Sequence, residues 1–350
     1  MTGIELLDVT LVAIGAAIAM VLITVGVSSL VRAHRVRMEP LLADARRATI
    51  AALAGDQTEI DDAFTSLNRI PQRYVSIVML DLAPSVTGAS RAVLVVLAER
   101  VGLLARARRG VRHWSWPSRL YSARVLTAFG VESEALCTLL TDRSPEVRAQ
   151  AAAWCAATPS VPAIEGVIGL LGDSDGLCRF AAQDALIRIG LQSSDALLGA
   201  LDGASEEVTG RILEIAAAMG DTRFLGVAIG LSSDPLPRTR ALACAVLARS
   251  GDPSAGSVLV DLLQDPSEDV VLAAAAGLAR LSYWPGAAEL EPLLHNESWE
   301  LRKQASLSLL ALGAPGTIML QVTAPGEGPA AEMAGQALQL RSITSQSEVA

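Results

Sequence analysis

The chain has 350 residues, of which 51% are hydrophobic, 3% are aromatic and 19% are charged. So large an apolar fraction excludes intrinsic disorder, because disordered segments lack the apolar surface that a folded core buries. The formal net charge of −9 argues against general nucleic-acid binding, since a basic face is needed to neutralise phosphates. The apolar excess is Ala, Leu and Val, and the strong helix formers Ala and Leu favour packed helices over sheets.

The first element is an apolar segment at residues 9–31 that contains no charged residue. As a helix it would reach about 34 Å, enough to cross the hydrocarbon core of a bilayer. We interpret it as an uncleaved membrane anchor and not as a signal peptide. Glu5 and Asp8 stand where a signal peptide is basic, and the apolar segment is longer than a signal peptide needs.

The flanks of this segment predict its orientation. Its C-terminal side is basic, with Arg32, His34, Arg35 and Arg37. Because basic flanks stay on the cytoplasmic side, residues 1–8 are expected outside the cell. The rest of the chain, from residue 32 onward, is expected in the cytoplasm.

Residues 32–110 follow the anchor without a regular repeat. Their apolar periodicity predicts helices at 39–53, 59–67, 72–82 and 90–107. A stack of repeats needs a modified end that covers its first apolar face. We therefore expect this juxtamembrane region to cap the repeats that follow it.

From residue 142 onward the sequence repeats itself. Units equivalent to the segment Asp-x-Ser-Pro-Glu-Val-Arg begin at Asp142, Asp173, Gly203, Asp234, Asp265, Asn296 and Glu327, in steps of 30 or 31 residues. Five, nine and thirteen residues after each start the residues are mostly apolar or small. Positions four apart share one helix face, so each unit opens with a helix that carries an apolar stripe.

Each unit then turns and forms a second helix. Glycine recurs seventeen residues after the start, at Gly190, Gly220, Gly251 and Gly313, where it can end a helix with a positive φ. Shorter apolar segments follow, as at 164–171 and 257–263. Pro145, Pro235 and Pro266 lie where the first helical turn tolerates proline, and Asp142, Asp234 and Asp265 are predicted to cap these helices.

The repeated pattern resembles the short HEAT-like repeats, the type also met in phycobilisome lyases. The resemblance is carried by residues 142–148, 173–179, 234–240 and 296–302. It implies an all-α fold, an armadillo-like α-solenoid of helix pairs at 111–341, here in a membrane-anchored bacterial form. A single transmembrane helix would precede the solenoid, and the polar tail 342–350 is expected to be disordered.

In such repeats the recurring Asp and Arg resemble a ladder that links neighbouring units. On this resemblance the ladder residues are Asp142, Arg148, Asp173, Arg179, Asp234, Arg240 and Arg302. The pattern is broken by Gly203 with Thr209 and again at Val271, so we expect gaps in the ladder there.

The sequence predicts no enzyme, no cofactor and no metal site. None of the three histidines has a spacing typical of a catalytic triad or a metal site, and no phosphate-binding glycine loop is present. Cys137, Cys155, Cys178 and Cys244 form no CxxC and are expected to be buried free thiols.

These features favour a membrane-tethered cytoplasmic scaffold that recruits or regulates an unidentified protein. The second helices are expected to line the binding face, with Glu165, Asp261, Glu289 and Glu291 as candidate contacts, unless these positions serve packing alone. Trp284 and Trp299, near the turns of adjacent units, are further candidate contacts. An alternative is an accessory subunit of a membrane enzyme complex, for example in cell-envelope glycan synthesis. A lyase or cofactor chaperone is disfavoured, because that resemblance lies in the repeat alone. The oligomeric state is left open.

Overall fold

The computed structural model describes residues 20, 24–25, 38–131 and 134–347. Every regular element in these ranges is a helix, which confirms the predicted all-α class. The chain divides into two compact units, residues 1–135 and 136–350. The predicted extracellular tail and nearly all of the predicted membrane segment 9–31 lie outside the described residues. Among the described helices, none combines the length and the apolar character that a membrane span requires.

The described part of the first unit consists of short helices that pack into one core. After helical residues 38–54, they are α2 (Gln57–Leu67), α3 (Gln72–Leu82), α4 (Gly88–Arg100), α5 (Leu103–Gly110) and α6 (Trp116–Phe129). The core is built from fully buried side chains such as Met79, Leu97 and Leu126. The single helix expected at 90–107 is in fact two helices, because Gly102 adopts a φ of 73° between them.

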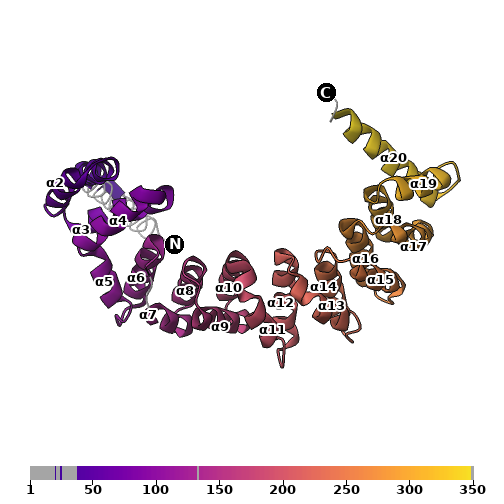
Figure 1. The fold of residues 1–350 in the computed structure, drawn as a ribbon, viewed down its shortest axis with the longest axis horizontal. Helices are drawn as coiled ribbons and strands as arrows, with labels where there is room; N and C mark the ends of the chain where they lie inside the picture. Colours follow the sequence, from indigo (N-terminus) through magenta and orange to yellow (C-terminus); the bar gives the residue numbers. More distant parts are fainter. Residues whose placement is uncertain (1–19, 21–23, 26–37, 132–133, 348–350) are drawn as a thin grey trace, which may run out of the picture. The chain divides into compact units, whose positions relative to one another are not determined.

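The second unit is a stack of helix pairs, as the repeat predicted. The first helices are α8 (Pro145–Ala157), α10 (Gly176–Ile189), α12 (Glu206–Met219), α14 (Pro237–Leu247), α16 (Glu268–Leu281) and α18 (Trp299–Ala311). The second helices are α9 (Val161–Gly169), α11 (Ser194–Ala200), α13 (Leu225–Leu231), α15 (Ser254–Asp261), α17 (Ala287–Leu290) and α19 (Ala314–Thr323). Figure 1 shows α8, α10, α12 and α14 following one another in one layer, with α9, α11 and α13 in the other.

The predicted apolar stripes form the core of this stack. At the ninth position after each start, Ala151, Ala182, Ile212, Ala243, Ala274 and Ala305 are all 0% exposed. The thirteenth position, which includes Leu186 and Leu247, is equally buried. The alanines are small enough for consecutive first helices to pack directly against each other. The stripe therefore joins units sideways, and each repeat depends on its neighbours for burial.

The starts of the first helices differ from the prediction. Asp142, Asp234 and Asp265 do not cap the helices; each accepts a hydrogen bond from the backbone N–H two residues later, at 2.8–2.9 Å. The helices begin three residues after these aspartates, with Ser144, Leu236 and Ser267 in the cap position. Pro145 opens α8 as predicted, whereas Pro235 and Pro266 lie ahead of the caps of α14 and α16. The aspartates thus shape the turn that precedes each helix.

The ends of the first helices follow the prediction more closely. The four repeated glycines have φ values between 67° and 77°. Such values favour glycine, because a Cβ atom would crowd the backbone. The chain can therefore reverse direction sharply before the second helix of the unit.

The last element is α20 (Pro329–Ser347), which packs against α18 and α19. The sequence predicted disorder from residue 342, whereas the helix continues to Ser347. After Gly335 the segment contains neither Gly nor Pro, so nothing in it forces the helix to end earlier.

Candidate interaction surface

The exposed side of the first helices carries the most distinctive surface of the second unit. A hollow of about 500 Å³ crosses α12, α14 and α16. Its apolar lining is Leu242 together with seven small residues, namely Ala217, Ala218, Ala245, Ala248, Ala273, Ala276 and Gly277. Because these residues are short, they leave space above the closely packed helices. We call this feature the alanine groove.

Charged side chains mark the margins of the alanine groove. Glu214 lies on α12, Arg280 on the last turn of α16, and Arg249 just beyond the end of α14. Glu214 accepts a hydrogen bond from Gln183 at 3.0 Å, whereas no carboxylate in the described residues forms an ion pair with Arg249 or Arg280. An apolar floor bordered by two exposed guanidinium groups suits an amphipathic helix that carries acidic side chains.

An apolar stripe continues this surface on α10. Leu177, Phe180 and Ile187 of α10 are spaced for one helix face and are 50%, 70% and 38% exposed. Leu191, in the short helix η4 (Gly190–Ser193) that follows, is 60% exposed. By repeat register Ile187 corresponds to Ala248 of the groove, whereas Phe180 corresponds to Ala241 and Leu177 to Arg238 on α14. The hydrogen bond from Gln183 to Glu214 ties this helix to the groove margin. An exposed apolar stripe of this kind is typical of a protein-binding face.

The predicted ladder residues lie at the turns between units. The Arg148 guanidinium donates two hydrogen bonds of 2.8 Å to Asp173 of the next unit and one of 2.7 Å to the Asp142 carbonyl. Arg240 repeats this arrangement with Asp265 at 2.7 and 2.8 Å and with the Asp234 carbonyl at 2.8 Å.

These two ion pairs are largely buried and electrostatically coupled. The side chains of Arg148 and Asp173 are 14% and 10% exposed, and those of Arg240 and Asp265 are 12% and 6% exposed. Hydrogen bonds from the arginines lower the pKa of both aspartates, although burial opposes the shift. Each pair therefore stays charged and holds adjacent units in register.

The other ladder residues make fewer links. Arg179 and Arg302 donate only to backbone carbonyls of their own turns among the described residues. The position 25 residues after Arg179, where Asp173 and Asp265 stand in the paired units, is Ala204. Arg302 also leaves its Nε atom buried without a partner in the described part of the chain. The break at Gly203 therefore coincides with a missing carboxylate.

A second set of links, which the repeat pattern did not predict, spans this break. Arg223, in the short helix η5 (Thr222–Phe224), donates to Asp195 at 2.6 Å and to the Leu191 carbonyl at 2.7 Å in the preceding unit. It also binds Asp221. Burial raises the pKa of this carboxyl, but hydrogen bonds, chiefly from Arg223, together outweigh burial and lower the pKa to about 2. Arg211 of α12 donates to the Leu171 carbonyl at 2.8 Å. Neither arginine recurs at the equivalent position of the other units. A comparison of equivalent positions between units therefore does not find them.

The residues predicted from sequence as partner contacts lie away from the alanine groove. Glu165, Asp261 and Glu289 belong to the second helices and are exposed. Glu291 lies in the helical turn η8 (Glu291–His295), and Trp284 begins η7 (Trp284–Gly286). Trp299, at the start of α18, is 55% exposed and has the Lys303 ammonium 4.9 Å from its ring centre. The candidate contacts on the second helices therefore lie on a different face from the alanine groove, which is formed by the first helices.

The thiols and histidines do not gather into a reactive cluster in the described ranges. Burial raises the pKa of Cys155 and of Cys244 to about 12, which keeps both thiols protonated and unreactive. His295 lies 3.4 Å from Glu291, and the His113 ring is tilted by 32° against Trp114 with the ring centres 5.6 Å apart. No group of His, Cys, Asp and Glu among the described residues is arranged to hold a metal ion.

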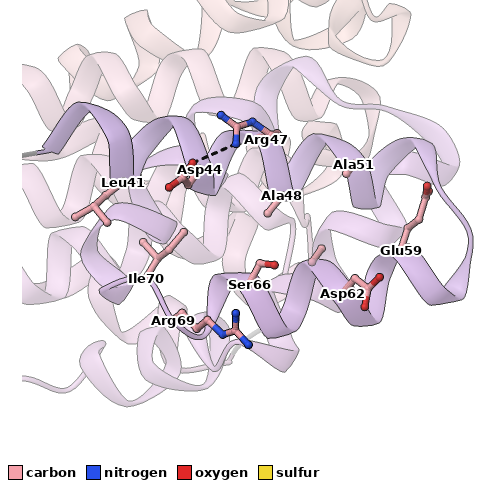
Figure 2. Close-up of a pocket in the computed structure, with 11 residues that line it drawn as sticks. Leu41, Asp44, Arg47, Ala48, Ala51, Glu59, Asp62, Ser66, Arg69 and Ile70 are labelled. Atoms are coloured by element: carbon pink, nitrogen blue, oxygen red, sulfur yellow. Dashed lines mark ion pairs between the residues drawn. The ribbon is translucent and has the colours of Figure 1, made fainter.

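A further hollow of about 610 Å³ lies in the first unit, between helical residues 38–54 and α2. Figure 2 shows Asp44 and Arg47 on one wall, where they form an ion pair of 3.3 Å, and Asp62 on the other. Arg69 and Glu59 complete a lining of mixed charge. Because opposite charges alternate around it, this hollow favours no single class of ligand.

Comparison with known proteins agrees with the geometry of the second unit. Residues 133–214 and 194–280 match the model of HEAT repeats. The segment 133–280 carries HEAT repeats. With the helix pairs described above, this match confirms the HEAT-like solenoid predicted from sequence. No curated protein matches the chain in sequence.

Solved structures show likeness at low sequence identity. Kap121p is 14% identical, with a TM-score of 0.50 over 81% of this chain and 38% of that chain. The CpcE and CpcF complex of phycocyanin lyase from Nostoc sp. PCC7120 is 18% identical, with a TM-score of 0.33 over 67% and 93%. Escherichia coli YibA is also 18% identical, with a TM-score of 0.40 over 68% and 94%. At these identities the Kap121p likeness shows the HEAT solenoid fold alone.

Proposed function

We propose that this chain is a membrane-tethered cytoplasmic scaffold whose HEAT solenoid binds an amphipathic helix of a partner protein in the alanine groove. The observation that carries the proposal is the groove itself, an apolar floor about 500 Å³ in volume across α12, α14 and α16. Stacked helix pairs present extended surfaces of this kind, and a helix in a groove is a common mode of recognition.

The partner that fits this surface carries apolar residues on one face and carboxylates beside them. Its apolar side chains would cover the alanines, and Phe180 would extend the contact by aromatic burial. Its carboxylates would pair with Arg249 and Arg280. No enzymatic step is required of the solenoid in this proposal.

Site-specific photo-crosslinking tests which face binds the partner. A photoreactive amino acid at Ala245, in the groove, is expected to capture a partner in native membranes, whereas one at Asp261, on α15, is not. Replacing Ala276 with Arg should abolish capture from position 245, because the long side chain fills the exposed floor. Capture from Asp261 alone would favour the second-helix face and contradict the proposal.

The tether is supported by the uncharged apolar segment 9–31 and the basic flank that follows it. The full-length chain is expected to resist alkaline extraction from membranes, and removal of residues 9–31 should release it. Replacing the segment with an unrelated apolar span separates two roles. A scaffold should still capture its partner, whereas an accessory subunit that packs against other spans through its own span should lose its association with the complex.

A further inference from the structure

Positive charge is concentrated in one segment of the first unit. Residues 100–124 contain seven arginines and no acidic residue, although the chain as a whole has a net charge of −9. Residues 136–350, by contrast, contain 25 acidic and 13 basic residues. The HEAT solenoid therefore repels anions, while α5 and α6 attract them.

The arginines of this segment differ in what they contact. Arg100 and Arg108 are paired with Asp61 and Glu99 at 2.6 and 2.7 Å. Arg106 and Arg109 are exposed residues of α5, and Arg112 is exposed in the turn that follows it, so that each is three residues from the next. Among the described residues, no carboxylate forms an ion pair with any of these three. They form one cationic row.

Exposed aromatic side chains adjoin this row. Trp114 is 87% exposed, Trp116 is 46% exposed and Tyr121 is 41% exposed. The turn that presents the tryptophans is held by Arg119, which donates to the carbonyls of His113 and Trp114 at 3.0 and 2.9 Å. Trp114 is thus displayed to solvent by a fixed turn.

A mainly apolar hollow lies beside the row and the aromatic side chains. It has a volume of about 670 Å³, and its lining includes Ile77, Leu103 and Tyr121. Arg73 and Arg106 also line it. The combination of an apolar hollow with guanidinium groups matches an amphiphile that has an anionic head.

We infer that Arg106, Arg109, Arg112, Trp114 and Trp116, the basic-aromatic surface, bind anionic phospholipid headgroups and lay the first unit on the bilayer. Guanidinium groups pair with phosphate, and tryptophan favours the level of the headgroups. An acidic protein could pair with the same arginines, but tryptophans beside arginines and an apolar hollow, close in sequence to the proposed tether, match the headgroup level of a bilayer better. That the bilayer is near the first unit rests on the proposed tether, since only six residues, 32–37, separate the segment 9–31 from residue 38.

Tryptophan quenching in nanodiscs tests this inference on the full-length chain. The discs contain phosphatidylcholine alone or with phosphatidylglycerol, and in each case part of the lipid is brominated. Quenching is expected to be about threefold stronger with phosphatidylglycerol and to weaken in high salt. Trp114→Phe should remove most of this increment, whereas Trp284→Phe, at an exposed tryptophan of the second unit, should leave it intact.

Charge variants provide the matched control. The triple variant Arg106→Gln, Arg109→Gln, Arg112→Gln is expected to lose the additional tryptophan quenching that phosphatidylglycerol causes. The variant Arg143→Gln, Arg188→Gln, Arg238→Gln removes the same charge from the second unit and should keep it. If the additional quenching with phosphatidylglycerol persists both in the first triple variant and in Trp114→Phe, the inference is overturned. Protection of residues 100–124 from hydrogen exchange by poly-glutamate, without protection by phosphatidylglycerol, would assign the surface to an acidic protein instead.

The tether and the basic-aromatic surface fail in distinguishable ways. If the chain is extracted by alkali, the tether is wrong. The surface is then tested by flotation with phosphatidylglycerol vesicles against phosphatidylcholine vesicles, and the same two triple variants are compared. Flotation that needs phosphatidylglycerol and the row of arginines would support the surface without a tether, and its absence would overturn the surface as well.

Discussion

Arg148 shows how a single side chain joins two repeats. Its guanidinium binds the Asp173 carboxylate of the next unit and the Asp142 carbonyl of its own turn. Both ends are largely buried, so water offers little compensation if either partner is lost. The contribution of the ladder therefore depends on complete pairs, and the sequence motif alone does not show which arginines have a carboxylate within reach.

We predict that Arg148→Met lowers the free energy of unfolding by about 1.5–3 kcal/mol, because it leaves the Asp173 carboxylate buried without its partner. Urea denaturation followed by circular dichroism measures the change. Arg143→Met, at the exposed arginine of the same turn, is the control and should change stability by less than about 0.5 kcal/mol. Equal effects of the two substitutions would show that the pair contributes nothing specific.

The lowered carboxylate pKa values predict a loss of stability in acid. The pKa of Asp221 is about 2 in the folded chain, against an ordinary value of 3.8 for an aspartate. Its contribution is fully present above about pH 4 and is lost as the pH falls through 2, because the unfolded chain binds the proton first. Asp221→Asn should therefore cost about 1–2 kcal/mol at pH 7, after allowance for the half-exposed Arg223.

The same substitution should have less effect as the medium is acidified. Unfolding midpoints in urea at pH 7, 4 and 2.5 would show the difference between the native chain and Asp221→Asn shrinking across the last interval. A difference that stays constant over this range would mean that Asp221 is not held ionised by Arg223.

At the scale of elements, glycine decides how closely two helices approach. A Cβ atom added to Gly316 would lie 1.9 Å from the Leu309 carbonyl oxygen, so only glycine permits this contact between α19 and α18. The same principle operates between consecutive first helices, where alanines at the ninth position bring the backbones together. These helices can pack closely because the residues at their contacts are small, as well as because larger apolar side chains fill the rest of the core.

We predict that Gly316→Ala destabilises the chain by about 1–3 kcal/mol, since the backbones of α18 and α19 must separate. Gly335→Ala on α20 is the control, because nothing lies within 4 Å of the added Cβ and φ is not positive. It should stabilise the helix by about 0.5–1 kcal/mol. Thermal unfolding of both variants checks the opposite signs, and equal signs would contradict the packing argument.

At the scale of the whole molecule, the second unit has no single centre. Each first helix is buried by its two neighbours, so stability is shared between adjacent units and falls toward an end with one neighbour. The two units also differ in charge, and this separates an anion-attracting surface in the first from an acidic solenoid in the second.

Native-state hydrogen exchange should reveal this gradient. Amides of α12, α14 and α16 are expected to exchange most slowly, and those of α20 fastest, because α20 closes the stack from one side. Mass spectrometry of peptides from the full-length chain gives the order. Exchange at one common rate throughout residues 136–347 would indicate a single cooperative unit instead.

The 31-residue register by itself determined the all-α class, the helix pairs and their buried faces, because every unit needs the same small and apolar residues in order to stack. It also located the positive-φ glycines. Only the tertiary structure decided that Arg148 and Arg240 are paired while Arg179 is not, that Arg211 and Arg223 span the break, and that alanines form an open groove. These features depend on which residues of different units lie within a few ångströms of each other, and a repeat pattern records spacing within a unit but not contacts between units.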